Sequence, residues 1–588
     1  MAFPKVTISE FIDGPRPVPL RSLNRVACVG TAKKGKYGAF ILVSTDTDLD
    51  NKIGRTLHEG SVGLQTARDE GASDTAFVRV MGAARSASGW FSVTAPVGGS
   101  TVTDTVTVTI VGALGTNAHV ISIPSGSTSL QASYAIIAGL ATDPHVTATY
   151  DPGSSQVLLV AKTPGLAGNS ITYTLAEGAA APVEFTFADA AAPFNTGNLS
   201  GGFDGPKAAV KTVNDLELVA AYEGVFGNTI NVTFVPGTTA TEVIVNLTDG
   251  DLVTESFTLN FVASSLINGN EFAVLRGSNM VRGFFRTAGN IASPVLPTLA
   301  GNGTMASGSD GSPILDIDYL DALAILGKNQ AHVIFAPGQL SSAIRAQLIT
   351  QAHKSTILGG LRVAILNAPK LLDIATAEAG TYTTGFDSGS ADFGGSAVMV
   401  AGWATYSGQP QLGELSVSPD GFYAGHLAST PIYVSPAARS SSPYFRSIVA
   451  VDTDRTDVAF DAYTTGRLEA IILDPATGGY HCLNGRTLAS DSAHYYVSIR
   501  RMANQIKTDL WFATQPLKSE PKTDGLLSSI SNMVNAYLTS KTNIGQIKAG
   551  AITSVTKTSN GIRLDFQWYP VYPADQIDYG MHRNAADI

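Results

Sequence analysis

Residues 331–366 have the sequence AHVIFAPGQLSSAIRAQLITQAHKSTILGGLRVAIL, in which two short apolar runs flank a longer amphipathic one. The first run, 331–335, ends at a Pro-Gly pair and predicts a buried strand. The stretch 340–358 repeats apolar residues at helical spacing, and 361–366 predicts the next strand. A strand, a helix and a strand of these lengths predict a parallel pair with a right-handed crossover.

The same alternation predicts α/β structure on both sides of this stretch. Short apolar runs at 25–30, 40–43 and 77–80 predict strands near the start of the chain. Thr523 and Asp524 are candidate caps for a long helix near the end, and a second helix is expected over 492–512. These patterns predict the start of a core at 21–87, a central α/β domain at 306–480 and a C-terminal α/β domain at 481–561.

Between these parts the sequence changes to alternating Val and Thr, as in residues 101–110. Such alternation is typical of half-buried antiparallel strands. We therefore expect an inserted β-rich domain at 88–202, with one helix near 129–140, and a second β-rich domain at 203–305. The fold class is multidomain, with α/β and α+β parts.

A short internal repeat lies within the two β-rich stretches. Residues 165–171, GLAGNSI, recur 59 residues later as GVFGNTI at 224–230. Each copy follows an apolar strand, and glycine supplies the positive φ that a tight turn needs. A phosphate-binding loop would require a following helix with Lys and Ser or Thr, which neither copy has. Two glycine turns, each joining the strands of a hairpin, are the preferred interpretation.

Composition describes a folded protein with an uneven charge. The chain has 588 residues, 44% hydrophobic and 15% charged, and a net charge of −10. Residues 88–300 hold six Lys and Arg against fifteen Asp and Glu, whereas residues 481–560 hold nine against four. One surface is therefore expected to be acidic and another basic. The sequence has no run of Lys and Arg, so direct contact with nucleic acid is not expected.

The two cysteines, Cys28 and Cys482, are too few for a disulfide framework and fit a reducing compartment. Cys28 lies in an apolar run and is expected to be a small buried side chain. The first twenty residues have no continuous apolar core, so no export signal is expected there. No apolar run reaches the length of a membrane helix. We expect a protein made in the cytoplasm and not inserted in a membrane.

No set of residues predicts catalysis, a cofactor or a metal. Asp46, Asp48 and Asp50 resemble the start of a calcium loop, but Leu57 stands where that loop needs a bidentate Glu. A capped helix start explains these three acids better. The nine histidines show no paired metal spacing, and His481-Cys482 is more simply structural. The chain is therefore expected not to be an enzyme.

Both ends of the chain predict extended arms, at 1–20 and 562–588. The first holds four prolines, and the second alternates apolar and polar residues before a proline. An unpaired strand leaves its backbone groups unsatisfied, so it tends to join a neighbour's sheet. The residues expected to add to a neighbouring subunit are Val6, Ile8, Ile562, Leu564, Phe566 and Trp568. This pattern favours a lattice-forming structural subunit.

Several stretches resemble the sheath proteins of contractile phage tails and related injection systems. They include Gly14-Pro15-Arg16-Pro17, residues 26–35, residues 335–338 with 365–369, and above all residues 485–501. The resemblance implies hexameric rings stacked into a helical tube around an inner tail tube, with baseplate and tail terminator proteins as further partners. It also implies a central domain of subtilisin-like topology without protease chemistry, and a place in the virion tail after assembly in the host cytoplasm.

The basic region suggests a contact with the inner tube through Arg500, Arg501 and Lys507, and the acidic 88–300 region is expected to point outward. Three alternatives remain open at this point. The chain could be the sheath of a non-viral injection system, a β-rich surface adhesin or a hydrolase built on the α/β domain. The missing export signal argues against the adhesin, and the missing Ser/His/Asp set argues against the hydrolase.

Overall fold

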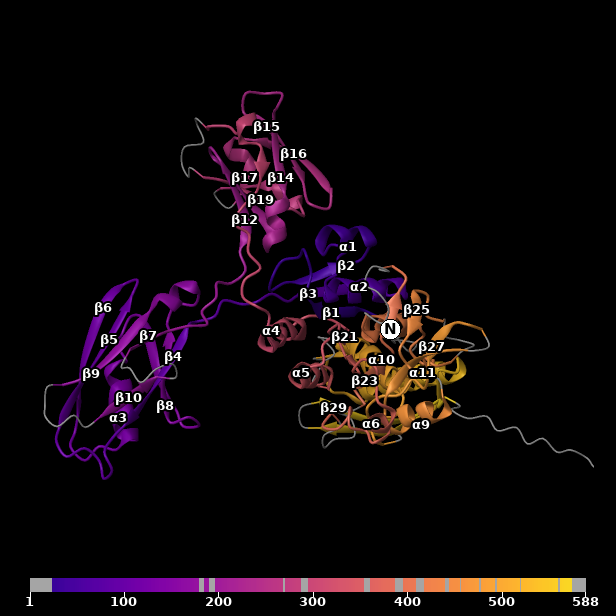
Figure 1. Ribbon diagram of the computed structural model, residues 1–588. Coiled ribbons are helices and arrows are strands. Elements are labelled where there is room, and N and C mark those ends of the chain that lie inside the picture. The colour runs from indigo at the N-terminus through magenta and orange to yellow at the C-terminus, as the bar shows by residue number, and fades with distance from the viewer. Residues whose placement is uncertain are drawn as a thin grey trace, which may run out of the picture. The chain divides into compact units, whose positions relative to one another are not determined.

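The computed structural model describes residues 24–573 except 179–184, 190–195, 268–269, 287–293, 354–359, 387–394, 409–416, 439–443, 455, 475–476, 492–493, 519 and 559–560. Val6 and Ile8 therefore lie outside the described residues, as do 574–588. The chain forms two compact units (Figure 1). The first takes residues 1–33, 38–80 and 319–588, and the second takes 34–37 and 81–318.

The first unit is built on one eight-stranded sheet with the order β2-β3-β1-β21-β22-β23-β26-β27. Its six central strands pair in parallel, and β2 and β27 are antiparallel strands at the two edges. The strands are β1 (Val26–Gly30), β2 (Phe40–Val43), β3 (Thr75–Arg79), β21 (Val333–Phe335), β22 (Val363–Asn367), β23 (Ala397–Ala401), β26 (Glu469–Leu473) and β27 (Tyr480–Cys482). The parallel pair predicted from residues 331–366 is confirmed as β21 and β22.

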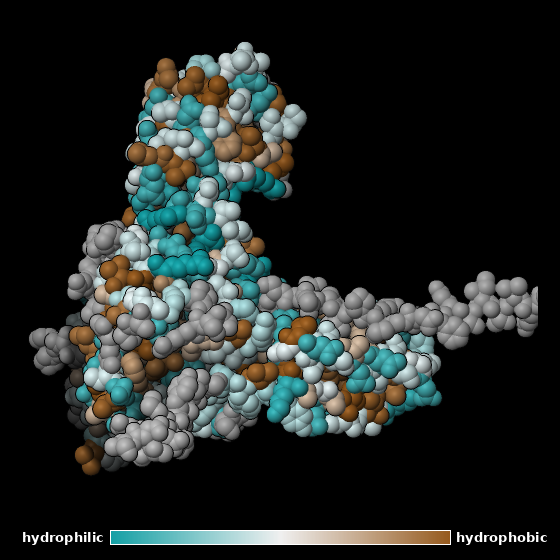
Figure 2. Space-filling model, turned by 90° about the vertical axis from the view of Figure 1, so that its right-hand side faces the viewer, coloured by the Kyte–Doolittle hydropathy of each residue, from teal (hydrophilic) through white to brown (hydrophobic). Residues whose placement is uncertain are grey.

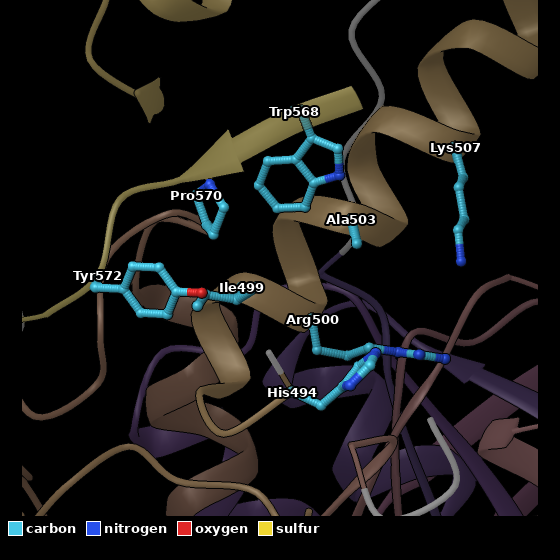
Figure 3. A pocket seen from close by; sticks show the side chains of 8 residues that line it. All are labelled: His494, Ile499, Arg500, Ala503, Lys507, Trp568, Pro570 and Tyr572. Atoms are coloured by element: carbon cyan, nitrogen blue, oxygen red, sulfur yellow. The ribbon is translucent and has the colours of Figure 1, made fainter. Parts of the chain in front are cut away.

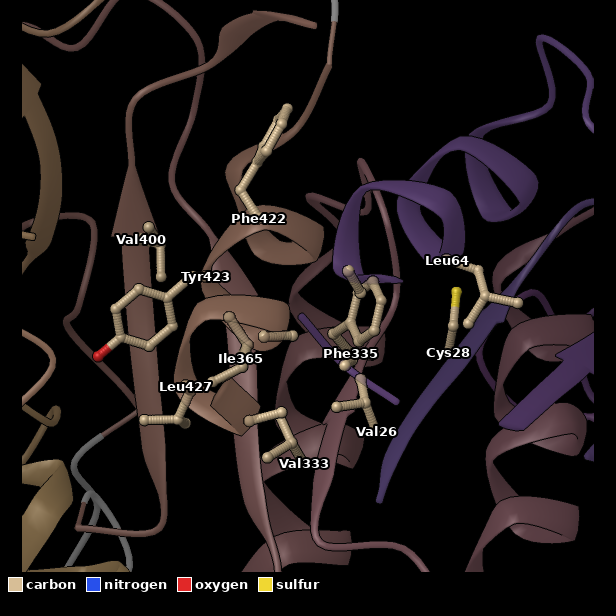
Figure 4. Close-up of a cluster of buried hydrophobic side chains, with 14 of the residues drawn as sticks. Val26, Cys28, Leu64, Val333, Phe335, Ile365, Val400, Phe422, Tyr423 and Leu427 are labelled. Atoms are coloured by element: carbon tan, nitrogen blue, oxygen red, sulfur yellow. The ribbon is translucent and has the colours of Figure 1, made fainter. Parts of the chain in front are cut away.

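Helices cover both faces of this sheet, because successive strand residues point to opposite sides. Val26 and Cys28 belong to one core, and Ala27 and Val29 to the other. The first core is packed by α1 (Asp46–Lys52), α2 (Glu59–Asp69) and α8 (Pro419–Ser429), and the second by α4 (Asp316–Gly327), α5 (Ser342–His353), α6 (Ile374–Glu378) and α9 (Asp457–Thr465). Figure 4 shows Cys28 beside Leu64 in the first core, which confirms it as a buried side chain. A small sheet of β24 (Ala404–Tyr406) and β25 (Ile448–Val451) lies beside it.

The end of the first unit forms a smaller core of its own. It consists of α10 (Val497–Thr514), α11 (Asp524–Asn543) and a two-stranded sheet of β28 (Ile547–Thr558) and β29 (Gly561–Pro570). The predicted cap is confirmed, because the Thr523 side chain accepts a hydrogen bond from the backbone N–H of Leu526.

The second unit contains two β-sandwiches, each with its own core. The first pairs the sheets β10-β4-β8-β7 and β11-β9-β5-β6 and carries α3 (Ser129–Gly139). Its strands are β4 (Ser88–Thr94), β5 (Asp104–Gly112), β6 (Gly115–Ile123), β7 (Val146–Asp151), β8 (Gln156–Ala161), β9 (Thr172–Glu177), β10 (Thr186–Asp189) and β11 (Thr196–Asn198).

The second sandwich pairs the sheets β12-β13-β19-β18-β17 and β16-β15-β14-β20. Its strands are β12 (Ala208–Val213), β13 (Leu216–Glu223), β14 (Asn231–Pro236), β15 (Glu242–Thr248), β16 (Thr254–Asn260), β17 (Leu266–Ile267), β18 (Glu271–Phe272), β19 (Val281–Phe285) and β20 (Gly303–Thr304). The loop 34–37 belongs to this unit: Lys34 is buried and pairs with Asp249 at 2.5 Å and Asp251 at 3.0 Å.

The repeated glycine motif forms a corner in each sandwich, not the predicted hairpin. Gly165 and Gly224 have φ of 121° and 114°, as the sequence predicted, and each begins a five-residue 3-10 turn. The turn carries the chain from β8 to β9, or from β13 to β14, and the two strands lie in different sheets of the sandwich. The hairpin prediction is wrong because the two strands that flank each turn pair with other strands of their own sheets and not with each other.

The asparagine of each corner fastens the strand by which the chain leaves the sandwich. Asn169 donates to the carbonyl of Gly202 at 2.9 Å and accepts from its N–H at 2.8 Å. Asn228 makes the same two bonds with Gly308, at 3.0 and 2.7 Å. In the first sandwich the carbonyl of Arg85 accepts hydrogen bonds from the backbone N–H groups of residues 165 and 203. In the second, the carbonyl of Lys207 accepts the equivalent bonds from the N–H groups of residues 224 and 309. The two sandwiches therefore share one closing motif, which joins the points where the chain enters and leaves.

Candidate interaction surface

The helices α10 and α11 support the β28–β29 sheet through one apolar cluster. Met502 and Ile506 on α10 meet Leu538 on α11, and all three are buried. Leu564, Phe566 and Trp568 pack against this cluster from β29. Because apolar and polar residues alternate along β29, its other face carries exposed residues such as Arg563 and Gln567. The predicted two-faced strand is therefore confirmed.

The strand β29 is not a free arm, which corrects the expected boundary at 562. It pairs antiparallel with β28 of the same chain, from Gly561 opposite Thr558 to Pro570 opposite Ile547. Ile562, Leu564, Phe566 and Trp568 therefore find backbone partners without a second subunit. The sequence pattern could not reveal this, because the large apolar residues of β28, Ile547, Ile552 and Val555, do not alternate regularly with polar ones. Addition of a neighbour's strand beside this hairpin stays a prediction.

The three predicted tube-facing cations differ in exposure. Arg501 is 3% exposed and donates to the carbonyl of Thr430 at 3.1 Å and to the Asn24 side chain at 3.4 Å. Burial lowers the pKa of its guanidinium to about 10. Arg501 is therefore an internal cation and does not face another protein. Arg500 is mostly buried, and Lys507 is exposed.

A buried polar network holds α10 against α11. Asp509 is fully buried and accepts hydrogen bonds from the Tyr537 hydroxyl at 2.9 Å and from the Gln505 amide. Burial, with Asp509 close by, raises the pKa of Tyr537, whereas burial lowers the pKa of Lys541 in the same interface. Sequence reasoning missed this network, since polar residues at these positions look like an exposed helix face.

A pocket of about 320 Å³ opens between α10 and the end of β29 (Figure 3). Its walls combine cationic and aromatic side chains: His494, Ile499, Arg500, Ala503, Lys507, Trp568, Pro570 and Tyr572. In Figure 3 the Tyr572 hydroxyl points toward Ile499, and the head groups of Arg500 and Lys507 lie on the opposite side. The pocket can thus receive a carboxylate attached to an apolar or aromatic group.

A second, apolar groove of about 580 Å³ lies in the second sandwich, between β14, β15 and residues 296–300. Among its lining residues, Phe234 and Val243 are buried and Leu299 is 64% exposed. Figure 2 shows hydrophobic residues gathered on the surface of this sandwich. Exposed apolar patches of this kind are typical of contacts with other proteins.

The place where an open α/β sheet usually binds ligands is filled in this chain. Ligands usually bind at the C-terminal ends of the parallel strands, at the point where the strand order changes direction. In this sheet that point lies at β1, which pairs with β3 on one side and with β21 on the other. A Cβ atom on Gly30 would lie 2.6 Å from the backbone of Gly60, so β1 and α2 are in direct contact. A Cβ atom on Gly63 would lie 2.2 Å from Pro337, which follows β21.

A hydrogen-bonded acid closes the same edge. Asp420 at the start of α8 is fully buried and accepts bonds from the Ser418 hydroxyl at 2.7 Å, the Asn367 amide at 2.8 Å and the N–H of Gly421 at 2.9 Å. Burial raises the pKa of Asp420 to about 6. These hydrogen bonds join the residue that ends β22 to the start of α8, which is a structural arrangement.

The acidic triplet near the start of the chain is a capped helix, as predicted. Thr45 accepts from the N–H of Asp48, and Asp48 pairs with Lys52 at 2.8 Å. Asp50 pairs with Arg55 at 2.7 Å. Among the residues that the structure describes, no three His, Cys, Asp or Glu side chains are placed to hold a metal. In the same residues, no helix has the length and apolar character to cross a bilayer.

No protein-family model and no curated protein matches the sequence. Several solved structures match the fold of this chain. A sheath tail protein from Listeria innocua matches with a TM-score of 0.54 and 11% identity, over 94% of this chain and 96% of that one. A sheath tail protein from Desulfitobacterium hafniense matches with a TM-score of 0.51 and 12% identity, over 96% of each chain. The chain therefore has the fold of the sheath tail proteins.

Proposed function

We propose that this chain is the structural subunit of a contractile tail sheath. Copies stack as hexameric rings around an inner tail tube, and the array contracts to drive the tube through a target envelope. The likeness of almost the whole chain to two sheath tail proteins carries this proposal. The filled edge of the α/β sheet supports a structural role and not catalysis.

We further propose that neighbouring copies are linked at the β28–β29 hairpin. A two-stranded sheet is marginal on its own and gains stability from added strands. An added strand makes about five backbone hydrogen bonds at about 1 kcal/mol each, besides side-chain burial. The candidate strands are the arm at 1–20, with Val6 and Ile8, and the residues beyond 573. Such links let subunits rotate while they stay connected.

The contact with the inner tube is proposed for Lys507 and Arg500. Lys507 is exposed and carries most of this contact, whereas Arg500 is only 7% exposed and reaches the surface at the wall of the same pocket. Exposed ion pairs contribute about 0–1 kcal/mol each, so an array of them holds the tube and still releases it quickly. Arg501 takes no part in this proposal, because it is internal.

The remaining assignments follow from the sheath proposal. The acidic sandwiches point outward, the central domain has a subtilisin-like topology, and the ends of the array meet baseplate and tail terminator proteins. The subunit is assembled in the host cytoplasm, ends in the virion tail and neither enters a membrane nor contacts nucleic acid. Contraction draws on a metastable array and not on a nucleotide.

The experiment is negative-stain microscopy of the purified chain beside two variants, one without residues 1–20 and one without 574–588. We expect long striated tubes from the full chain and shorter or no tubes from either variant. Circular dichroism of each variant checks that the described fold is retained. Monodisperse particles from the full chain at all concentrations and salt conditions would reject the sheath proposal.

A further inference from the structure

The pocket between α10 and β29 lies where the described chain ends. Pro570 and Tyr572 both line it, and the description stops at Pro573. The ring of Tyr572 is 53% exposed and packs edge-on against Tyr496, with centroids 6.2 Å apart. The next residues of the chain therefore begin beside this pocket.

Those next residues have the chemistry that the pocket walls complement. They read ADQIDY from 574 to 579, with carboxylates at Asp575 and Asp578 and apolar groups at Ile577 and Tyr579. An extended chain advances about 3.5 Å per residue, so Asp575 lies within about 7 Å of Pro573 and Asp578 within about 18 Å. Both carboxylates are therefore tethered close to the residues that line the pocket.

We propose that residues 574–579 dock in the pocket of their own chain before assembly. The carboxylates of Asp575 and Asp578 meet Lys507 and Arg500, and the side chains of Ile577 and Tyr579 cover the apolar wall around Trp568. The cationic pocket and the acidic segment are complementary in charge, and the segment begins beside the pocket.

Tethering makes this docking effective although each contact is weak. Exposed ion pairs contribute about 0–1 kcal/mol each, which alone gives poor binding. A segment held by a few residues has an effective concentration in the millimolar range, whereas a second copy reaches only its concentration in solution. The same-chain segment therefore occupies the pocket ahead of a second copy.

The consequence for assembly rests on the proposed function. The segment that would add to a neighbour's hairpin is retained by its own subunit, and it covers the cations proposed to contact the tube. Departure of the segment thus supplies a strand and exposes the cations in one step. A free subunit would be prevented from polymerising until a growing end competes for its segment.

The test uses the unassembled full chain and the accessibility of Trp568 to acrylamide. The chain has four tryptophans, so each variant is measured with and without Trp568→Phe to isolate this one. We expect Asp575→Lys with Asp578→Lys to raise quenching of Trp568 about twofold, and Lys507→Glu to do the same. Combining the three changes restores one of the two ion pairs, between a lysine of the segment and Glu at position 507, and returns quenching about halfway to its original value. Lys548→Glu, on the exposed part of β28, is the matched control and leaves it unchanged.

The possible outcomes distinguish docking by the chain's own segment from docking by the segment of a second copy. Equal quenching in all variants would overturn the proposal, and so would a restoration that disappears on dilution, because that would assign the pocket to a second copy. Restoration that is independent of protein concentration supports docking within one chain. Since the measurement needs no tubes, a persistent effect in a protein that never forms tubes would uphold the docking and reject the sheath proposal.

Discussion

Charge alone does not tell which cations of α10 meet solvent. Arg501 and Lys507 contribute equally to the basic character of residues 481–560, yet one is internal and the other exposed. The difference comes from partners far away in the sequence, because Thr430 and Asn24 receive the hydrogen bonds of Arg501. A sequence predicts that a charged residue lies on a helix, but not which distant carbonyl will face it.

A buried acid gives the first prediction, on pH. Burial raises the pKa of Glu469 from its ordinary 4.5 to about 7, although the N–H groups of Asn484 and Arg486 donate to its carboxylate. Between those pH values the folded chain keeps a proton that the unfolded chain releases, so this group lowers the free energy of unfolding as pH rises. The slope from one such proton is at most about 1.4 kcal/mol per pH unit.

Denaturant titrations of the wild type and Glu469→Gln from pH 4.5 to 7 check this prediction. We expect a shallower decline with pH in the variant. Parallel curves for the two proteins would show that the carboxyl titrates alike in the folded and unfolded chain.

The second prediction concerns Lys34, which is 1% exposed between the carboxylates of Asp249 and Asp251. Lys34→Met leaves Asp249 buried without its cation, which typically costs about 3–5 kcal/mol. The second sandwich should therefore melt earlier in calorimetry. Lys36→Met is the control in the same loop, because Lys36 is exposed. If the two variants melt alike, the buried ion pair does not stabilise the sandwich.

At the scale of elements, the sequence predicts backbone conformation better than pairing. The repeat at 165 and 224 correctly indicates positive φ, because only glycine adopts it without strain. It does not indicate that the strands on either side enter different sheets, since β8 pairs with β4 and β7 while β9 pairs with β5 and β11. Likewise, alternation along β29 predicts two faces but not its partner β28.

The two corners provide the third prediction. Asn169→Ala and Asn228→Ala each remove a donor and an acceptor that fasten the strand leaving the sandwich. Each loss should cost about 1–3 kcal/mol, because the N–H and the carbonyl of a glycine that is buried (Gly202) or half-buried (Gly308) lose their partner. Hydrogen exchange should rise in the sandwich that carries the change and not in the other one. Ser170→Ala, which removes only a local bond to Ala167, is the control.

At the scale of the whole molecule, composition locates the β-rich insertions. It does not predict that the strands before and after these insertions pair in one sheet. Strands from 26–79 and from 333–482 share one sheet, although the two sandwiches separate them in the sequence. The parallel pairing of β1 with β21 crosses this gap of about three hundred residues. Such a pairing has no local signal, because either strand alone is only a short apolar run.

The fourth prediction is that the first sandwich can be removed without unfolding the rest. Arg85 and Phe203 are bridged, so joining Arg85 to Asp204 spans a short distance. The first unit and the second sandwich keep their own cores in this deletion. We expect an unchanged melting transition for the first unit, and tubes of smaller diameter in negative stain if the sandwich points outward. A deletion that abolishes folding of the first unit would show that the cores are not independent.

The shared closing motif also has a practical consequence. In each sandwich the segment that enters and the segment that leaves are hydrogen-bonded to each other, so the two ends of the domain lie close together. The residues between these ends can therefore change without moving the points of attachment. Such a domain can be exchanged during evolution while the rest of the chain keeps its fold. A designer could insert an antigen or an enzyme with closely spaced ends at the same two positions, between Arg85 and Phe203 or between Lys207 and Ser309.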